Sequence, residues 1–177
     1  MSRRSQTRLS VLGALATEPA TGYGVRRAII ETLGHFWHES FGQIYPTLAA
    51  LEEDELVERD ADGRFTITKR GRDELASMLA EEPEATPPRN GLLLRIFFAQ
   101  HLGRKRALEL LESTADAAKK KLAEFDAIER AIDEEARPEA PFWRATVRYG
   151  VFHARATIAW VEETRALFEK PRAAKSR

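Results

Sequence analysis

The sequence predicts a mainly α-helical fold with one small β-hairpin, and three observations support this fold class. Apolar residues recur at helical spacing along most of the 177 residues. Asp62-Gly63 separates two short β-prone runs, 57–60 and 64–68, which is a strong hairpin signal. Three predicted helices precede this hairpin, and a fourth follows it directly. That order is typical of a winged helix-turn-helix domain, in which the hairpin forms the wing.

The first two helices are predicted from their apolar faces and their end signals. They span about 7–16 and about 22–33. Thr21 can cap the second helix, and Gly34 can end it. The segment 18–22 between them contains a Glu-Pro dipeptide and is predicted to be a loop.

The third helix carries the most informative pattern of the chain. Ser40 and Gln43 have capping-box spacing, so the helix should begin there. Its core-facing residues then recur at helical spacing: Ile44, Leu48 and Leu51. In a helix that reads DNA, the first turn presents side chains to base edges and phosphates. We expect that turn to carry Gln43, Tyr45, Pro46 and Thr47.

A proline-rich segment separates the winged part from the rest of the chain. Thr68 is predicted to cap a fourth helix that runs to about Ala80. Residues 81–90 follow, with three prolines and no large apolar side chain, and Pro87-Pro88 does not fit a helix interior. We therefore expect a DNA-binding domain over 1–82, a linker over 83–90 and a helical dimerisation domain over 91–177.

Beyond the linker every segment has helical periodicity. A short helix is predicted around Leu92 to Phe97, a second from about Arg104, and a last one over about 142–168. The two long helices carry heptad repeats, which predict a coiled-coil-like seam. One series is Leu111, Ala115, Ala118, Leu122, Phe125 and Ile132, and the other is Val147, Val151, Ala154, Ile158, Val161 and Phe168. The last helix cannot bury both this seam and its aromatic side chains, so part of it should meet a second subunit. A dimer is expected, although the seams alone also allow a tetramer.

Composition excludes several classes of function. Without cysteine the chain has no disulfide and no thiolate ligand or nucleophile. It has no run of about 20 apolar residues that could span a bilayer, and its first residues lack an apolar secretory segment, so we expect a cytoplasmic protein. Phosphate-loop, dinucleotide and paired metal-ligand motifs are also missing, which predicts neither a catalytic residue nor a cofactor. His35 and His38 have helical spacing, but no third ligand is clearly placed, so no metal site is expected.

The charge of the chain supports DNA binding less strongly than the predicted order of helices and hairpin does. The formal net charge is +0, and residues 1–89 hold 11 Lys and Arg against 15 Asp and Glu. DNA-binding domains often carry a basic excess. Two readings remain open: a two-sided domain that is basic only toward DNA, and a winged-helix scaffold for protein interactions.

Four segments resemble the PadR type of transcriptional regulator. They are LSVLGAL at 9–15, TGYGVRRAI at 21–29, SFGQIYPTLAALEEDELVE at 40–58 and FTITKRGRDEL at 65–75. The helices after the linker resemble the longer subtype of that family. One departure is Glu55, because the family usually has glycine there as a left-handed helix terminator. The third helix is expected either to end by another geometry or to tolerate a strained turn.

The resemblance implies a homodimer that binds a pseudo-palindromic operator, usually as a repressor. It also implies that C-terminal helices pack against the partner subunit, and that a small hydrophobic or aromatic effector binds near the dimer interface. With the pattern of polar and basic residues, it makes these the candidate DNA-contacting residues: Arg3, Arg4, Ser40, Gln43, Tyr45, Pro46, Thr47, Arg64, Lys69 and Arg70.

Each candidate has a plainer alternative. Gln43 can contact adenine or complete the capping box, Tyr45 can be half-buried against the wing, and the basic residues can be solvated surface charges. Aromatic residues of the last helix are candidates for an effector pocket or for ordinary interface packing. They are Trp143, Tyr149, Phe152, His153 and Trp160. An enzyme that uses His153 is a weak hypothesis, because no second catalytic group accompanies it.

Overall fold

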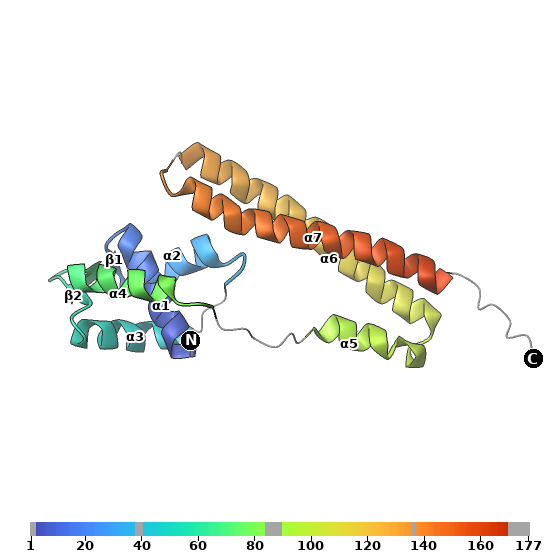
Figure 1. Cartoon of the computed structure of the whole chain (residues 1–177), viewed down its shortest axis with the longest axis horizontal. Helices are drawn as coiled ribbons and strands as arrows, with labels where there is room; N and C mark the ends of the chain where they lie inside the picture. Colours follow the sequence, from blue (N-terminus) through green and yellow to red (C-terminus); the bar gives the residue numbers. More distant parts are fainter. Residues whose placement is uncertain (1–2, 38–40, 84–89, 136, 170–177) are drawn as a thin grey trace, which may run out of the picture. The chain divides into compact units, whose positions relative to one another are not determined.

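A computed structural model describes residues 3–37, 41–83, 90–135 and 137–169, and the side chains of Arg3, Arg4 and Phe41 lie outside the described part. The chain divides into two compact units, Met1–Pro87 and Pro88–Arg177. Most described residues are helical (Figure 1). This confirms the predicted fold class, a mainly α protein with a small β wing.

The first unit begins with three helices and ends with a hairpin and a fourth helix. In chain order its elements are α1 (Arg3–Thr17), β1 (Ala20–Thr21), α2 (Gly22–Ala28), a π-helix η1 (Ile29–Leu33), α3 (Phe41–Glu53), β2 (Val57–Arg59), β3 (Arg64–Ile67) and α4 (Lys69–Ala80). One apolar core joins them, and its fully buried members include Leu12, Val25, Ile44, Leu48 and Leu51. The predicted core face of the third helix is therefore confirmed.

The sheet has three strands, one more than the sequence predicted. Its order is β1-β3-β2, with both pairs antiparallel. The prediction of a loop over 18–22 was wrong at Ala20 and Thr21, which pair with Phe65 and Arg64. A two-residue strand is too short to show alternation, so only pairing across the sheet defines it.

The second helix also differs from prediction. Thr21 caps it as expected, because its Oγ1 accepts the Gly24 N–H at 3.1 Å. The α-helix then passes into the five-residue π-helix η1 instead of continuing to Leu33. Gly34 follows directly, and a Cβ there would lie 2.3 Å from the Ile30 carbonyl oxygen. Glycine is thus required by a close backbone approach at this end.

Helix α3 ends in a Schellman motif with glutamate in the place of glycine. The Leu56 N–H donates to Leu51 O at 2.9 Å and the Glu55 N–H donates to Glu52 O at 3.0 Å. These are the two bonds of that motif, and they require a left-handed residue at position 55. Glu55 has φ 60°, the only positive value of a non-glycine residue in the described part of the chain. Of the two expected outcomes, the strained turn is the one found.

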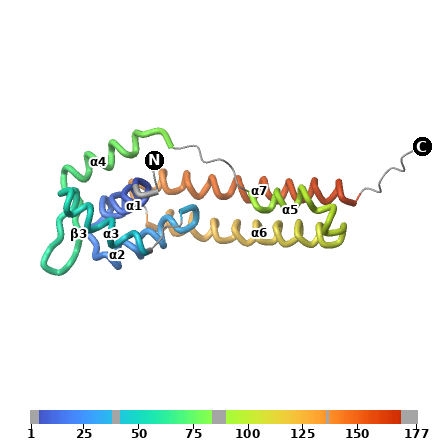
Figure 2. The backbone as a smooth tube through the Cα atoms, turned by 90° about the horizontal axis from the view of Figure 1, so that it is seen from below, coloured from blue at the N-terminus to red at the C-terminus, as the bar shows by residue number. Residues whose placement is uncertain are grey.

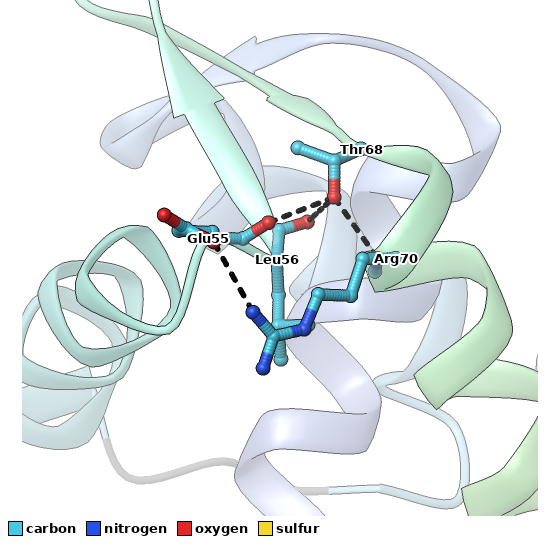
Figure 3. A network of polar contacts seen from close by, with 5 residues as sticks. Glu55, Leu56, Thr68 and Arg70 are labelled. Atoms are coloured by element: carbon cyan, nitrogen blue, oxygen red, sulfur yellow. Dashed lines mark hydrogen bonds and ion pairs between the residues drawn. The ribbon is translucent and has the colours of Figure 1, made fainter.

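Contacts from the start of α4 hold this corner (Figure 3). The Thr68 hydroxyl lies 2.9 Å from Glu55 O and 3.1 Å from Leu56 O, and it accepts the Gly71 N–H at 2.9 Å. The Thr68 N–H also donates to Leu56 O at 3.0 Å. Arg70 pairs with the Glu55 carboxylate at 3.2 Å. The exit of α3 is therefore tied to the base of the wing.

Replacing Glu55 with glycine is expected to stabilise the protein by about 1 kcal/mol. Left-handed backbone costs a side-chain-bearing residue about 1 kcal/mol or more, whereas the exposed ion pair with Arg70 contributes between about 0 and 1 kcal/mol. Urea unfolding of the full chain measures the difference. Glu55→Ala is the matched control, since it removes the ion pair and keeps the strain; equal stability of the two variants would show that the strain is negligible.

The second unit is built around two long antiparallel helices. It contains α5 (Gly91–Phe97), a 3₁₀ turn η2 (Ala99–His101), α6 (Arg104–Glu135) and α7 (Ala140–Glu169). Both views show α6 and α7 side by side along their length (Figures 1 and 2). The predicted seam is confirmed, because its buried members include Leu111, Ala115, Ala118, Phe125 and Ile132 of α6 and Val147, Val151, Ala154 and Val161 of α7.

None of the helices in the described part of the chain is long and apolar enough to cross a membrane. Among the same residues, no group of three or more histidine or acidic side chains is placed to hold a metal ion. Of the two histidines with helical spacing in the sequence, His38 lies outside the described residues.

Candidate nucleic-acid interface

Helix α3 presents an exposed polar face beside the wing. Gln43, Tyr45 and Pro46 are exposed and Thr47 is half-buried. Because α3 begins at Phe41, the residues Tyr45 to Thr47 lie in its second turn. The prediction that they lie in the first turn was therefore wrong. Pro46 therefore lies inside the helix, where it has no N–H to donate to the carbonyl of Gly42, an exposed residue. Ser40 lies outside the described residues, so its capping role is not described.

Tyr45 rests on a glycine of the neighbouring helix. A Cβ on Gly22 would lie 2.6 Å from Tyr45 Cε1, so the ring needs the bare backbone at the start of α2. The Tyr45 side chain is nevertheless 56% exposed. The contact with Gly22 thus fixes one edge of the ring, and the rest of the ring remains accessible to a ligand.

The wing turn is fixed by an aspartate. Asp60 Oδ1 accepts the N–H of Asp62 at 3.0 Å and that of Arg64 at 2.8 Å. Gly63 adopts φ 76°, a left-handed conformation that suits glycine. The turn therefore has a defined shape, and both of its titratable side chains are acidic.

The basic candidates on the wing and α4 have intramolecular partners in two of three cases. Arg64 Nη2 donates to Pro19 O at 2.6 Å, which ties β3 to the segment before β1. Arg70 pairs with Glu55, and Lys69 is exposed. Lys69 and Arg70 lie at the base of the wing, since the Val57–Ile67 pair is at that end of the hairpin. Arg3 and Arg4 belong to α1, but their side chains lie outside the described part.

A hollow of about 410 Å³ lies between α2, α3 and the wing. Its lining combines Tyr45 with residues that the sequence did not indicate as DNA-contacting: Thr21, Gly22, Tyr23, Leu48, Ala49, Glu52, Arg59, Asp62, Gly63 and Phe65. Arg59 is the lining cation. Strand alternation is the sequence signal that could have identified it. Alternation puts Arg59 on the same face of the hairpin as Val57, and Phe65 is its partner across the ladder on that face.

Two other cations of the first unit form ion pairs with carboxylates. Arg8 pairs with Asp54 at 2.9 Å and Arg27 with Glu31 at 2.7 Å. The hydrogen bond to Glu31 raises the pKa of the Arg27 guanidinium above its ordinary value. Two of the carboxylates of the acidic run at 52–55 therefore carry an arginine partner, Arg8 on Asp54 and Arg70 on Glu55.

The five aromatic candidates on α7 are not brought together in one place. Trp143 is half-buried and packs with Phe125 and Val147. Trp160 is half-buried and packs with Leu111 and Val161. Seventeen residues of helix separate the two indoles, which corresponds to roughly 25 Å. The expectation that the last helix cannot bury both the seam and all of its aromatic side chains holds for Phe152, which is 62% exposed, whereas both indoles lie half-buried beside the seam.

The other three candidates face outward. Tyr149 and Phe152 are 74% and 62% exposed, and His153 is exposed as well. Phe142 is 76% exposed and precedes Tyr149 by one heptad. These side chains form an apolar stripe that the seam within the unit does not use.

Three helices, a hairpin wing and an exposed helix face flanked by that wing together define a winged helix-turn-helix protein that binds DNA. Two family models match the chain: the PadR-like family of transcriptional regulators over residues 11–77, and the C-terminal part of virulence activator alpha over 88–169. The chain belongs to the PadR-like family and is a DNA-binding transcriptional regulator.

Two relatives are similar in sequence. The negative transcriptional regulator PadR of Bacillus subtilis is 23% identical over 73% of this chain and 76% of its own length. A probable transcriptional regulator of Mycobacterium tuberculosis, Rv1176c, is 31% identical over 48% of this chain and 49% of its own length.

Solved structures share the fold. Bacillus subtilis PadR superposes with a TM-score of 0.82 at 21% identity, covering 97% of this chain and 98% of that one. It has also been solved with operator DNA (TM-score 0.77, 21% identity, 92% and 98% covered) and with p-coumaric acid (0.81, 22%, 92% and 98%). The Vibrio cholerae virulence activator AphA gives 0.72 at 23% identity, covering 91% and 96%. These relatives are regulators and not enzymes.

Proposed function

We propose that the protein is a homodimeric repressor that binds a pseudo-palindromic operator with α3 in the major groove and the wing against the adjacent backbone. The observation that supports this most strongly is the exposed face of α3, where Gln43, Tyr45 and Pro46 stand clear of the core. A polar helix face of this kind fits the major groove. In this proposal residues 1–82 are the DNA-binding domain, 83–90 the linker and 91–177 the dimerisation domain, and the protein acts in the cytoplasm.

Within this proposal Gln43 contacts base edges, while Tyr45 and Thr47 position the backbone. Amide side chains can bind adenine through two hydrogen bonds, and hydroxyl groups mostly contact phosphates. Ser40, Pro46 and Lys69 complete the proposed surface, together with Arg3 and Arg4 at the start of α1. Arg64 and Arg70 are weaker candidates, because Pro19 O and Glu55 already accept their hydrogen bonds.

A mobility shift with the DNA upstream of the protein's own gene tests the function. We expect a discrete complex that survives excess nonspecific duplex. The alternative is a winged-helix scaffold without specific DNA binding, which the acidic balance of residues 1–89 favours. Salt dependence separates the two, since affinity for duplex DNA that falls steeply with added salt requires several phosphate contacts. Flat or absent binding to every duplex in a genome-wide selection would establish the scaffold.

The Tyr45→Ala variant is expected to bind the operator about 10-fold more weakly, which corresponds to roughly 1.4 kcal/mol. Its ring is exposed and leaves little cavity, so the thermal midpoint of the full chain should stay close to that of the parent. Fluorescence anisotropy and thermal unfolding measure the two quantities. Ala76→Ser, an exposed position of α4 outside the proposed surface, is the control. A large drop in stability would assign Tyr45 to the core.

For the dimer, the exposed stripe on α7 is the supporting observation. Phe142, Tyr149 and Phe152 lie at spacings of seven and three, so they form one strip of a helix. Contiguous exposed apolar side chains of this size usually mark an interaction surface. Sedimentation equilibrium of the full chain should give twice the monomer mass of 20.0 kDa; a monomer at micromolar concentration would contradict the proposal.

For the effector, we propose a small aromatic molecule at the outward-facing part of α7, near Tyr149, Phe152 and His153. A relative has been solved with p-coumaric acid, which makes that compound the first probe. Trp143 and Trp160 remain part of the proposal only as flanking walls, because both pack beside the seam. Release of the operator complex by p-coumaric acid would support the proposal, and release that persists in a Phe152→Ala, His153→Ala variant would place the effector elsewhere.

A further inference from the structure

The two arginines of the hairpin lie on opposite faces of its strands. Arg59 stands directly across from Phe65, and residues paired across an antiparallel ladder share a face. Arg64 is the neighbour of Phe65 along β3, so it lies on the other face. Phe65 is buried in the core of the first unit. The side chain of Arg59 therefore extends along the face of the hairpin that looks toward α3.

Arg64 is engaged within the protein. Its Nη2 donates to the carbonyl of Pro19 at 2.6 Å, and its own N–H donates to Asp60 at 2.8 Å. The first contact joins β3 to the segment that leads into β1, next to the Thr21–Arg64 pair of the sheet. Binding of this guanidinium to DNA would require that contact to be exchanged.

Arg59 is held in place by an aromatic ring and not by a carboxylate. Its guanidinium carbon lies 5.4 Å from the centroid of the Phe65 ring, and a Cβ on Gly63 would lie 3.4 Å from one of its terminal nitrogens. Stacking on an aromatic face orients an arginine while its N–H groups remain available. In the described part of the chain, no carboxylate forms an ion pair with Arg59.

The lining of the hollow between α2, α3 and the wing includes both Arg59 and Tyr45. The Tyr45 ring lies against the backbone of Gly22, which also lines the hollow. A guanidinium with free donors and a phenol hydroxyl are groups that bind phosphate oxygens. The carboxylates of Glu52 and Asp62 also line the hollow and repel anions. The hollow therefore attracts an anion only beside Arg59, where there is one cation to bind one phosphate.

We propose that Arg59, and not Arg64, is the residue through which the wing binds the operator backbone, with one phosphate held between Arg59 and Tyr45. This inference rests on the proposed function, because it assigns a residue to the same DNA-binding face. It also explains the acidic turn, since Asp60 and Asp62 at the tip are poorly suited to the negative potential of a minor groove. The wing lies against the backbone along its side, and its tip does not enter the groove.

Salt dependence of DNA binding tests the assignment. Each phosphate contact contributes about 0.9 to the slope of log affinity against log salt. Arg59→Gln should therefore reduce the slope by about 0.9 per bound subunit and weaken binding roughly 5- to 10-fold per subunit at 0.1 M salt. Arg64→Gln should leave the slope unchanged and change the affinity by no more than about 2-fold. The matched control is Arg72→Gln, an exposed arginine of α4. Fluorescence anisotropy with operator and nonspecific duplexes gives all the values.

A second variant tests the charge of the hollow from the opposite direction. Glu52→Gln removes a lining carboxylate and should strengthen binding to both duplexes by about 3-fold or more if a phosphate lies within roughly 6 Å. Arg59→Gln should weaken binding to both duplexes equally, because a phosphate contact carries no sequence information. Thermal unfolding of each variant checks that the fold is kept.

The outcomes distinguish a failure of the proposed function from a failure of the Arg59 assignment. Absence of salt-dependent binding by the parent protein to any duplex would remove the proposed function itself. A parent that binds with the expected slope, combined with an Arg59→Gln variant that keeps this slope, would overturn the assignment and leave the function intact. Loss of slope in Arg64→Gln alone would give the contact to Arg64, and loss of sequence preference in Arg59→Gln would make it a base contact.

Discussion

Replacing Gly71 with alanine is expected to destabilise the first unit by about 3 kcal/mol. A Cβ at this position would lie 2.1 Å from the carbonyl oxygen of Leu56 and 2.8 Å from Ile67 Cγ1. The Leu56 oxygen cannot move away freely, since it accepts hydrogen bonds from the N–H and hydroxyl of Thr68 at 3.0 and 3.1 Å. Overpacking against backbone costs about 1–3 kcal/mol or more, and each weakened hydrogen bond adds about 1 kcal/mol.

Urea unfolding of the full chain measures the loss as a lower midpoint at an unchanged slope. Hydrogen exchange followed by mass spectrometry localises it, because protection should fall in α1 to α4. Gly13→Ala is the matched control: a Cβ there has no atom within 4 Å, and alanine favours a helix interior by up to about 1 kcal/mol. If Gly71→Ala were as stable as Gly13→Ala, the close approach of α4 to the α3–β2 corner would not exist.

Replacing Phe125 with alanine is expected to destabilise the second unit by about 3–5 kcal/mol. The ring is buried in the seam and lies over the backbone of α7 at Gly150, where a Cβ would be 2.4 Å from Phe125 Cζ. Truncating a buried phenylalanine loses its transfer free energy and leaves a cavity. Gly150 has no side chain to fill that cavity. Thermal unfolding of the full chain, with hydrogen exchange in α6 and α7, measures the effect.

A second substitution at Gly150 should change sign between two backgrounds. Gly150→Ala alone forces the Phe125 ring to shift and should destabilise, because overpacking outweighs the roughly 1 kcal/mol gain in helix propensity. In the Phe125→Ala background the ring is gone, so Gly150→Ala should recover about 1 kcal/mol. Additive effects of the two substitutions would show that the ring does not rest on Gly150.

Much of the helical framework could be predicted because its signals are local. The cap of Thr21 on α2 and that of Thr68 on α4 each depend on an N–H three residues away. The seam of α6 and α7 could be predicted for a related reason: heptad positions on one helix reveal its buried face whatever the partner is.

The candidate interface was predictable in part. The exposed face of α3 followed from the positions left after Ile44, Leu48 and Leu51 were assigned to the core. The direction of long side chains did not follow, because it depends on groups far away in sequence. Arg64 was selected as the basic residue after the turn, yet Pro19, 45 residues earlier, accepts its hydrogen bond. Apart from strand alternation, nothing in the local pattern distinguishes Arg59 from other surface arginines, although its pairing with Phe65 brings it to the hollow.

By itself, then, the sequence determined the helices of both units, the hairpin and the seam, since these depend on residues within about one or two helical turns of each other. It also determined the resemblance to PadR-like regulators, which rests on motifs that can be read without the fold. The tertiary structure alone decided the strand pairing of Ala20 and Thr21, the left-handed turn at Glu55 and the partners of the wing arginines. Each of these depends on atoms that folding brings together from distant segments, and local periodicity carries no information about such contacts.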